Sequence, residues 1–291
     1  MQTWAHWCAG GSRIEVELGG VPRQIFRRVE GNGPWLTLLH GWPTSSYDWA
    51  HVAPELARTR KLLAFDFLGF GDSDKPADHR YDVLEHADTV EAVWRAEGVT
   101  ETAIAAHDIG VSVAKELLTR VREGTLRTRI TKATLSNGIV FEDQHRALVI
   151  QKLLLNSVLG PVLSRLSNEM IFRGQFANAF TKEQRLAREE VHEHWLAIAN
   201  RGGTKIGGKL IQFLRDVHRE SERWAATITA LPVPTRFIWG MADPVAGAQM
   251  IDELVKRVPD ANVVRLADVG HYPHISAPGA VSAAIIEHLN N

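Results

Sequence analysis

The sequence predicts an α/β fold with a mostly parallel, doubly wound sheet and an inserted helical cap. Two observations support this prediction. Short apolar stretches typical of buried strands alternate with amphipathic helical patterns along most of the chain, as in a parallel sheet covered by helices. The alternation stops between about residues 138 and 225, where helical patterns follow one another directly. We therefore expect a core domain of residues 1–137 and 226–291, and a helical cap of residues 138–225.

The strands are expected to begin with a hairpin. Residues 12–18 and 21–29 alternate between apolar and polar side chains around Gly19-Gly20, which favours a tight turn. Helical spacing follows at residues 84–96 and 109–122 of the core. Further strands are expected at residues 35–40, 61–67, 102–106, 130–136, 235–239 and 262–266, and cap helices at 144–156, 182–200 and 209–224.

Composition limits the classes of partner. The 291 residues are 45% hydrophobic and carry a formal net charge of −1, so no basic surface for nucleic acid is expected. No stretch reaches the roughly 20 apolar residues that span a bilayer, so no membrane partner is expected. Cys8 is the single cysteine and excludes an intrachain disulfide, and residues 1–7 do not resemble a signal peptide. We expect a cytoplasmic monomer or homodimer that acts on a small molecule.

Asp108 is the candidate nucleophile. It occupies the centre of residues 106–110, Ala-His-Asp-Ile-Gly, between an expected strand and an expected helix. A turn of this kind exposes its central side chain at the end of the sheet. Serine there would indicate acyl transfer, whereas an ionised aspartate can displace a leaving group from saturated carbon and form an alkyl ester. The alternative is that Asp108 only caps the helix that follows.

A candidate oxyanion hole involves Trp42 and Ile109. Residues 40–43, His-Gly-Trp-Pro, follow the first buried strand, where the chain turns beneath the nucleophile. The backbone N–H groups of Trp42 and Ile109 are expected to converge on the oxygen of a tetrahedral intermediate. The alternative is that this segment is only a turn.

The candidate acid and base follow the last two expected strands. Asp243 comes after the strand at 235–239 and His271 after the strand at 262–266. His271 would deprotonate the water that cleaves the ester, and Asp243 would orient its imidazole and stabilise the imidazolium. Taken singly, Asp243 could be a turn residue and His271 a loop histidine. Glu142 is the fallback for the acid.

Two further motifs accompany this chain order of nucleophile, acid and histidine. They are HGWPTSSYDW at residues 40–49 and GDSDKP at residues 71–76. With these motifs the sequence resembles the aspartate-nucleophile branch of the α/β-hydrolase superfamily, namely haloalkane dehalogenases and epoxide hydrolases. The resemblance spans nearly the whole chain. It implies the α/β-hydrolase fold, an Asp-His-Asp triad of Asp108, His271 and Asp243, and no cofactor. No His or acidic residues lie at metal-ligand spacing, so no metal site is expected.

The sequence departs from both enzyme classes where the leaving group is bound. Dehalogenases of this family hold the halide with N–H donors, often a tryptophan directly after the nucleophile, where this chain has Ile109. Epoxide hydrolases use cap tyrosines, and Phe213 stands where one of them is expected. Cap histidines such as His192 or His218 could replace the tyrosine as acid. The predicted substrate and leaving-group pocket consists of His40, Trp42, Trp195, Phe213 and His194.

Three functions are compatible with these residues. The first, which the sequence favours because a missing halide donor is harder to replace than a missing cap tyrosine, is an epoxide hydrolase-like enzyme acting on a small apolar substrate through an ester on Asp108. The second is a haloalkane dehalogenase, which would need a halide donor such as the Trp42 indole. The third is a ligand-binding or sensor protein without catalysis, because both specialised leaving-group donors are missing. The triad argues against this third function, since a receptor does not need a base next to an ionised carboxylate.

Overall fold

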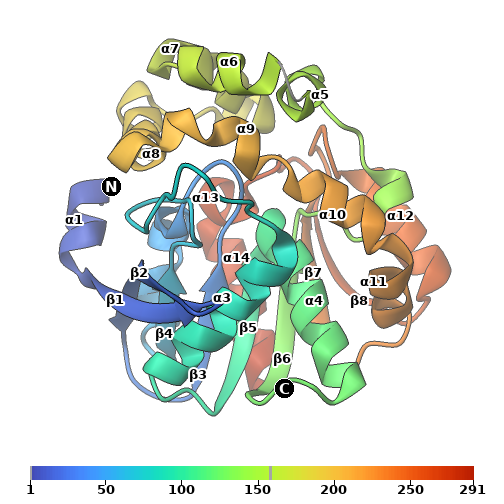
Figure 1. Cartoon of the computed structure of the whole chain (residues 1–291). Helices are drawn as coiled ribbons and strands as arrows, with labels where there is room; N and C mark the ends of the chain where they lie inside the picture. Colours follow the sequence, from blue (N-terminus) through green and yellow to red (C-terminus); the bar gives the residue numbers. More distant parts are fainter. Residues whose placement is uncertain (1, 157–158) are drawn as a thin grey trace.

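The computed structural model describes residues 2–156 and 159–291 and contains one eight-stranded sheet in the order β1-β2-β4-β3-β5-β6-β7-β8 (Figure 1). From β4 through β3 to β8, neighbouring strands run parallel. All the predicted strands are present, at bounds within a few residues of those expected: β1 Gly11–Leu18, β2 Val21–Glu30, β3 Trp35–Leu39, β4 Lys61–Phe65, β5 Glu101–His107, β6 Arg129–Ser136, β7 Thr235–Gly240 and β8 Asn262–Leu266.

The first two strands form the predicted hairpin. β1 and β2 pair antiparallel, with Leu18 opposite Val21. Gly19 and Gly20 both have positive φ, at 57° and 78°, which a two-residue turn between twisted strands requires. β2 then pairs antiparallel with β4, so the hairpin extends the parallel part of the sheet at one edge.

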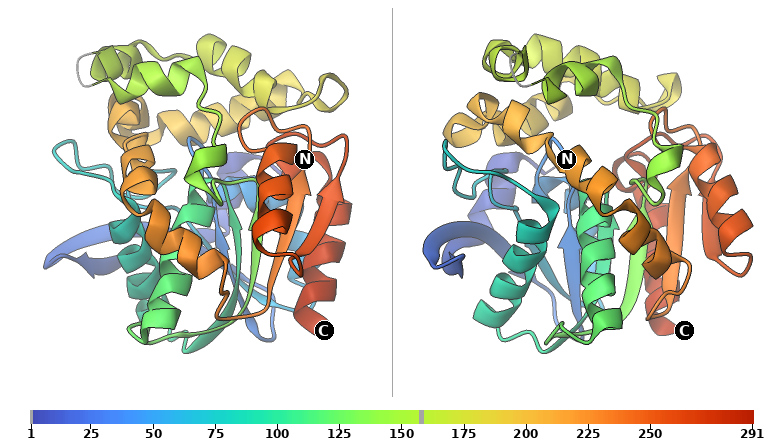
Figure 2. Two further views of the ribbon diagram at one scale, coloured as in Figure 1. Left: turned by 90° about the vertical axis from the view of Figure 1, so that its right-hand side faces the viewer. Right: turned by 45° about the vertical axis from the view of Figure 1, so that its right-hand side comes forward.

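Helices cover both faces of the sheet (Figure 2). Successive strand residues point to opposite faces, so Ile104 of β5 packs in one hydrophobic core and Ala105 in the other. The first core is closed by α3 (Val83–Ala96), α4 (Ile109–Glu123), α11 (Ser221–Ile228) and α12 (Ala248–Arg257). The second is closed by α1 (Trp4–Ala9), η1 (Ser46–His51), α2 (Ala53–Leu56) and α14 (Pro278–Asn290).

The chain between β6 and β7 is helical and stands over one end of the sheet, with α5, α6 and α7 as its outermost layer (Figure 1). This agrees with a cap, although the exact division into domains stays a prediction. The helical elements before α11 are η2 Glu142–Gln144, α5 Val149–Leu155, α6 Leu159–Leu166, α7 Glu169–Phe176, η3 Ala177–Ala179, η4 Lys182–Gln184, α8 Arg188–Ala199, η5 Asn200–Lys205, α9 Gly207–Leu210 and α10 Phe213–Arg219.

The expected bounds of the cap helices were wrong in detail. The helix expected at 144–156 begins only at Val149, and the one expected at 209–224 is divided among α9, α10 and α11. Val217 and Trp224 lie on either side of the α10–α11 break, and both are buried in the same core. Apolar spacing therefore continues across the break and does not reveal it. Among the residues that the structure describes, no helix has the length and apolar character to cross a membrane.

Candidate active site

Asp108 lies in a tight turn between β5 and α4. Its φ of 51° and ψ of −114° are uncommon for a residue with a side chain. The turn also brings Gly110 so close to β3 that a Cβ atom there would lie 2.5 Å from the Leu39 carbonyl oxygen, so only glycine fits. The strained turn places the Asp108 carboxylate at the carboxyl end of the sheet, as a nucleophile elbow does.

The first oxygen of this carboxylate is held by the turn after β3. The backbone N–H of Trp42 donates to Asp108 Oδ1 at 2.7 Å. Ile109 is the first residue of α4, where backbone N–H groups have no partner within the helix. Trp42 N therefore contacts the carboxylate and Ile109 directly follows Asp108, while their role as an oxyanion hole stays a prediction. The Trp42–Pro43 peptide bond is cis.

The second oxygen faces His271. The Nε2 atom of His271 lies 3.4 Å from Asp108 Oδ2, and its Nδ1 atom lies 2.8 Å from Asp243 Oδ2. Asp243 follows β7 and His271 follows β8, so both loops start at the same end of the sheet as the Asp108 turn. The fold thus brings together the three residues that the sequence singles out for catalysis.

The three groups shift one another's pKa values. Burial favours the protonated form of the Asp108 carboxyl, but the hydrogen bond and charge of His271 lower its pKa below the usual value. The pKa of Asp243 is lowered in the same way, with burial again opposing. Burial alone would lower the pKa of His271, whereas the charge of Asp243 and the bonds to both carboxylates raise it to about 10. The site therefore holds an imidazolium between two carboxylates.

Asn137 is a site residue that the sequence did not identify. Its side-chain amide donates to Asp243 Oδ2 at 3.0 Å and to the Gly240 carbonyl at 3.0 Å, and its Oδ1 accepts from Gly240 N at 2.7 Å. It is fully buried and fixes the second carboxylate oxygen that binds His271. The fallback acid, Glu142, instead lies in η2 and pairs with His218 at 3.2 Å, so the structure supports Asp243.

Two neighbouring apolar cavities lie under the cap, and Asp108 lines the smaller one. The smaller, of about 90 Å³, is lined by Asp108 and His271 together with apolar cap residues and the polar side chains Gln151, Gln175 and Tyr272. The larger, of about 320 Å³, contains Trp195 in its wall, and Trp42 lines both. The structure therefore places the predicted pocket residues Trp42 and Trp195 at the cavities. The buried indole N–H of Trp42 has no hydrogen-bond partner among the described residues.

The other three predicted pocket residues do not line either cavity, and this corrects the prediction. His40 is fully buried, with its ring between Phe67 and Phe70. Phe213 packs in the core that α4 closes. His194 is buried, and its Nδ1 atom lies 3.4 Å from Asp48 Oδ1. The sequence identified the helices on which the cap residues lie, but spacing could not show which helix face turns inward.

Two further cap histidines, His192 and His218, lie outside both cavity walls. His192 is exposed and pairs with Glu169 at 3.0 Å, while His218 is exposed and pairs with Glu142. Neither belongs to the cavity walls described above. His192 and His218 are therefore not the missing acid.

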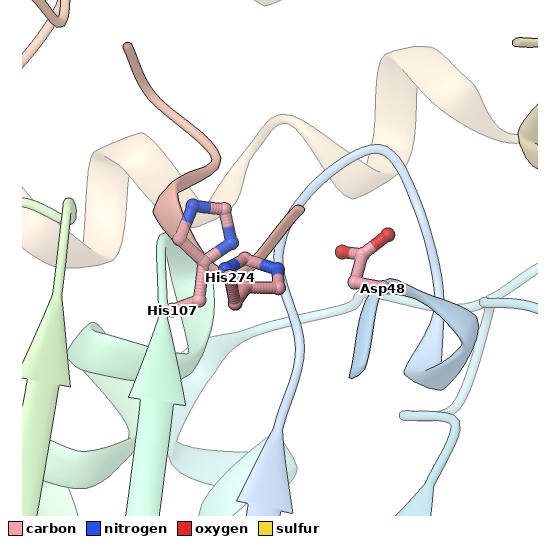
Figure 3. Close-up of side chains that lie close together, drawn as sticks. All are labelled: Asp48, His107 and His274. Carbon is pink, nitrogen blue, oxygen red and sulfur yellow. The ribbon is translucent and has the colours of Figure 1, made fainter. Parts of the chain in front are cut away.

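Behind the triad, three buried side chains form a polar cluster, Asp48, His107 and His274 (Figure 3). One donor atom from each lies within 4.8 Å of the others, and they come from η1, β5 and α13 (Pro273–Ser276). Burial lowers the pKa of both histidines well below the usual value, so both imidazoles are neutral. Imidazole and carboxylate are metal-ligand types, so these residues are the donor set that could hold a cation. Spacing along the chain could not reveal a cluster assembled from distant segments.

The match to known families agrees with this geometry. A family model described as the alpha/beta hydrolase fold matches residues 34–278. The chain belongs to the α/β-hydrolase family. This α/β-hydrolase is 37% identical over 283 residues to a protein of Mycobacterium tuberculosis named "Putative hydrolase LipZ", covering 97% of this chain and 96% of that protein. It is 35% identical over 270 residues to the human mesoderm-specific transcript homolog protein, covering 90% of this chain and 81% of that protein.

Further matches share either part of the sequence or the fold. This α/β-hydrolase is 37% identical to a haloalkane dehalogenase of Sphingobium indicum over 117 residues, which are 39% of each protein. Its fold is similar to that of the epoxide hydrolase CorEH, with a TM-score of 0.78, 19% identity and coverage of 96% and 99%. The haloalkane dehalogenase DbeA from Bradyrhizobium elkani superposes with a TM-score of 0.80, 20% identity and coverage of 96% and 98%. Family membership and hydrolase-named relatives indicate an enzyme.

Proposed function

We propose that the protein is a hydrolase that attacks a saturated carbon atom of a small apolar substrate with the Asp108 carboxylate. One observation carries this proposal: Asp108 stands at the elbow with Oδ1 bonded to Trp42 N and Oδ2 facing His271, at the wall of an apolar cavity. In the first step a carboxylate oxygen bonds to the carbon atom, and the leaving group departs with the bonding electrons. The product is an alkyl ester on Asp108.

Ester formation prepares His271 for the second step. The charge of Asp108 contributes to the raised pKa of His271, and this charge disappears when the carboxylate becomes an ester. The pKa of His271 then falls, so that it can release its proton to solvent and act as a base, while Asp243 stays bonded to Nδ1. His271 takes a proton from water, whose oxygen attacks the Asp108 carbonyl carbon. The tetrahedral intermediate collapses as His271 returns that proton to the departing alkoxide, and the alcohol leaves. The new carboxyl group of Asp108 then gives its proton to His271, which restores the ion pair. The backbone N–H of Trp42 stabilises the oxyanion, and Asp108 keeps one oxygen from water.

The donors at the cavity favour a halide as leaving group. The Trp42 indole N–H is buried without a partner, and Gln151 brings an amide to the same cavity. Such N–H groups donate hydrogen bonds but do not give up a proton at neutral pH. A halide leaves as a stable anion and needs no proton, so we rank carbon–halogen hydrolysis first. The identity with a haloalkane dehalogenase over 117 residues supports this order.

Epoxide hydrolysis is the second candidate, although the sequence alone favoured it. An opening epoxide needs a proton donor, and one specific observation provides it. Tyr272 lines the smaller cavity, and its hydroxyl contacts the Trp42 carbonyl at 3.3 Å. The phenol would have to leave this bond to donate to the substrate. The cap histidines that were expected to replace the missing tyrosine do not reach the cavity.

Trapping the ester tests the proposal. The His271→Gln variant is incubated in parallel with 1-bromohexane and 1,2-epoxyhexane, and the peptide that contains Asp108 is analysed by mass spectrometry. We expect a hexyl ester from the bromide; an adduct from the epoxide alone would instead support the second candidate. The Asp108→Asn/His271→Gln double variant is the matched control and should form no adduct. In single turnover of the wild type in heavy-oxygen water, label must enter Asp108. If it never does, the covalent scheme is wrong.

A further inference from the structure

The outer layer of the cap exposes many apolar side chains. Ten large hydrophobic side chains are exposed in the part of the chain that the structure describes, and eight of them lie within residues 148–171. Val149, Met170 and Leu166 are the most exposed, at 74%, 70% and 63%. We call these eight residues the outer cap surface: Leu148, Val149, Leu153, Leu159, Val162, Leu166, Met170 and Ile171.

The helices that carry this surface are apolar on both sides. In α6, Leu159, Val162 and Leu166 share the outer face, while Leu163 packs inward. A helix of a soluble protein normally has a polar outer face, and monomers rarely expose large continuous apolar patches. In both Figure 1 and Figure 2, α5, α6 and α7 lie at the outside of the cap, with no other element above them. The fold therefore does not explain why this face is apolar.

The same segment is positively charged. Residues 146–176 contain four basic side chains and one acidic one, although the whole chain carries −1. Within residues 2–156 and 159–291, no ion pair involves the basic residues Arg146, Lys152, Arg165 or Arg173. The one acidic residue, Glu169, pairs with His192. The outer cap surface therefore combines exposed apolar side chains with unpaired cations, which complements a negatively charged and apolar partner.

The larger cavity reaches this surface. Leu166 and Ile171 belong both to the cavity wall and to the exposed apolar set. Leu154 and Leu163 continue the wall inward, and Trp42 lines both this cavity and the smaller one beside Asp108. An apolar lining thus extends from the outer cap surface to the catalytic carboxylate.

We propose that the outer cap surface docks on an anionic lipid membrane. Leucine, valine and methionine side chains of α5, α6 and α7 enter the boundary between headgroups and acyl chains, and Lys152, Arg165 and Arg173 pair with lipid phosphates. The protein lies on the bilayer and does not span it. If the proposed function holds, an apolar substrate dissolved in the bilayer enters the larger cavity without crossing water. The docking itself does not depend on that function.

Vesicle sedimentation tests the docking. The full-length protein is mixed with vesicles of phosphatidylcholine alone or of phosphatidylcholine with phosphatidylglycerol. We expect sedimentation with the anionic vesicles, weakened by high salt, and at least about tenfold weaker binding to the neutral ones. No binding to either composition would overturn the proposal. Equal, salt-independent binding to both would overturn the assignment to an anionic surface.

Variants locate the contact on the protein. Val162→Asp/Met170→Asp removes apolar contacts at two exposed sites, and Lys152→Glu/Arg165→Glu reverses two unpaired charges. Each should weaken binding to anionic vesicles at least about tenfold. The first places two charges where apolar side chains enter the lipid, and the second reverses two basic residues that each contribute roughly fivefold near such a surface. Val21→Asp is the matched control, since Val21 is 42% exposed in the β1–β2 hairpin, and it should bind like the wild type. Thermal unfolding should be unchanged in all three, as every site is exposed.

Two further measurements separate the alternatives. The wild type could instead form a dimer that is lost in the Val162→Asp/Met170→Asp variant. That result, together with a lack of vesicle binding, would assign the surface to a second copy of the chain and overturn the proposal. Light scattering of the eluting protein measures this. The Asp108→Asn variant should bind vesicles as the wild type does, so failure of the proposed chemistry and failure of docking give different results.

Discussion

The Nε2 atom of His271 lies 3.4 Å from Asp108 Oδ2, a longer separation than the 2.8 Å between its Nδ1 atom and Asp243. The weaker of these two contacts is therefore the one that ester formation at Asp108 would break. In the proposed reaction, His271 keeps its orientation from Asp243 throughout, while the group on its other side changes from a carboxylate to an ester. One histidine can thus be a stable imidazolium in the free enzyme and a base in the ester intermediate.

The first prediction concerns stability and pH. The pKa of His271 rises from 6.5 to about 10 in the folded protein, where the proton lies between two carboxylates. Its stabilising contribution is therefore complete below about pH 6.5 and is lost as the pH rises through about 10. Urea unfolding of the wild type and His271→Gln should show a free-energy difference that shrinks between these two pH values. A difference independent of pH would contradict the raised pKa.

The second prediction concerns the leaving group. Trp42→Phe removes the indole N–H but keeps an aromatic ring at the cavity and the backbone N–H that binds Asp108. We expect the single-turnover rate of bromide release to fall about 100-fold, because one donor to the departing anion is lost. Trp49→Phe is the control: it removes another buried indole N–H without a described partner, at a residue outside the cavity walls. Equal rates in Trp42→Phe and the wild type would exclude the indole as donor.

The catalytic half of the site could be predicted from the sequence because the chain itself encodes it locally. Asp108 has a strand before it, a helix after it and a nearby glycine at 110, and all three features can be recognised in residues 101–123. Asp243 and His271 each follow a recognisable strand, and parallel strands end at the same edge of a sheet. Their proximity to Asp108 follows from the topology.

The cap side of the site could not be predicted in the same way. Phe213 and His194 lie on helices whose inward face depends on packing against the core. Helical periodicity cannot show which face turns inward when the two faces of a helix are equally apolar or equally polar. The sequence did not single out Asn137 as a site residue, because its partners Asp243 and Gly240 lie about 100 residues away along the chain. Long-range hydrogen bonds leave no local sequence pattern.

The third prediction concerns Asn137. The Asn137→Gly variant removes the amide that holds Asp243 and Gly240 but accepts the positive φ of 33° at this position. Losing these buried hydrogen bonds should lower the free energy of unfolding by about 1–3 kcal/mol. Because Asp243 then orients His271 less well, hydrolysis of the ester should slow more than its formation. Burst and steady-state rates separate the two steps, and an equal loss in both would argue for a general structural defect.

The fourth prediction concerns the bond between His107 and His271. The Nε2 atom of His107 donates to the His271 carbonyl oxygen at 2.8 Å and so connects the Asp108 turn to the loop that carries the base. His107→Phe keeps a ring of similar shape but leaves this buried carbonyl without its donor, at a cost of about 1–3 kcal/mol in unfolding free energy. Hydrolysis of the ester should slow about tenfold as the base loop shifts.

His274→Phe is the matched control for this bond. The His274 ring lies 4.5 Å from that of His107, and neither of its nitrogen atoms has a hydrogen-bond partner within the described residues. Replacing a buried, unpaired imidazole with phenylalanine should leave the unfolding free energy unchanged or raise it, because no bond is lost and a desolvation cost disappears. Chemical denaturation of both variants measures the contrast. If the two variants lose the same stability, the His107–His271 bond does not carry the effect, and the cluster acts only as packing.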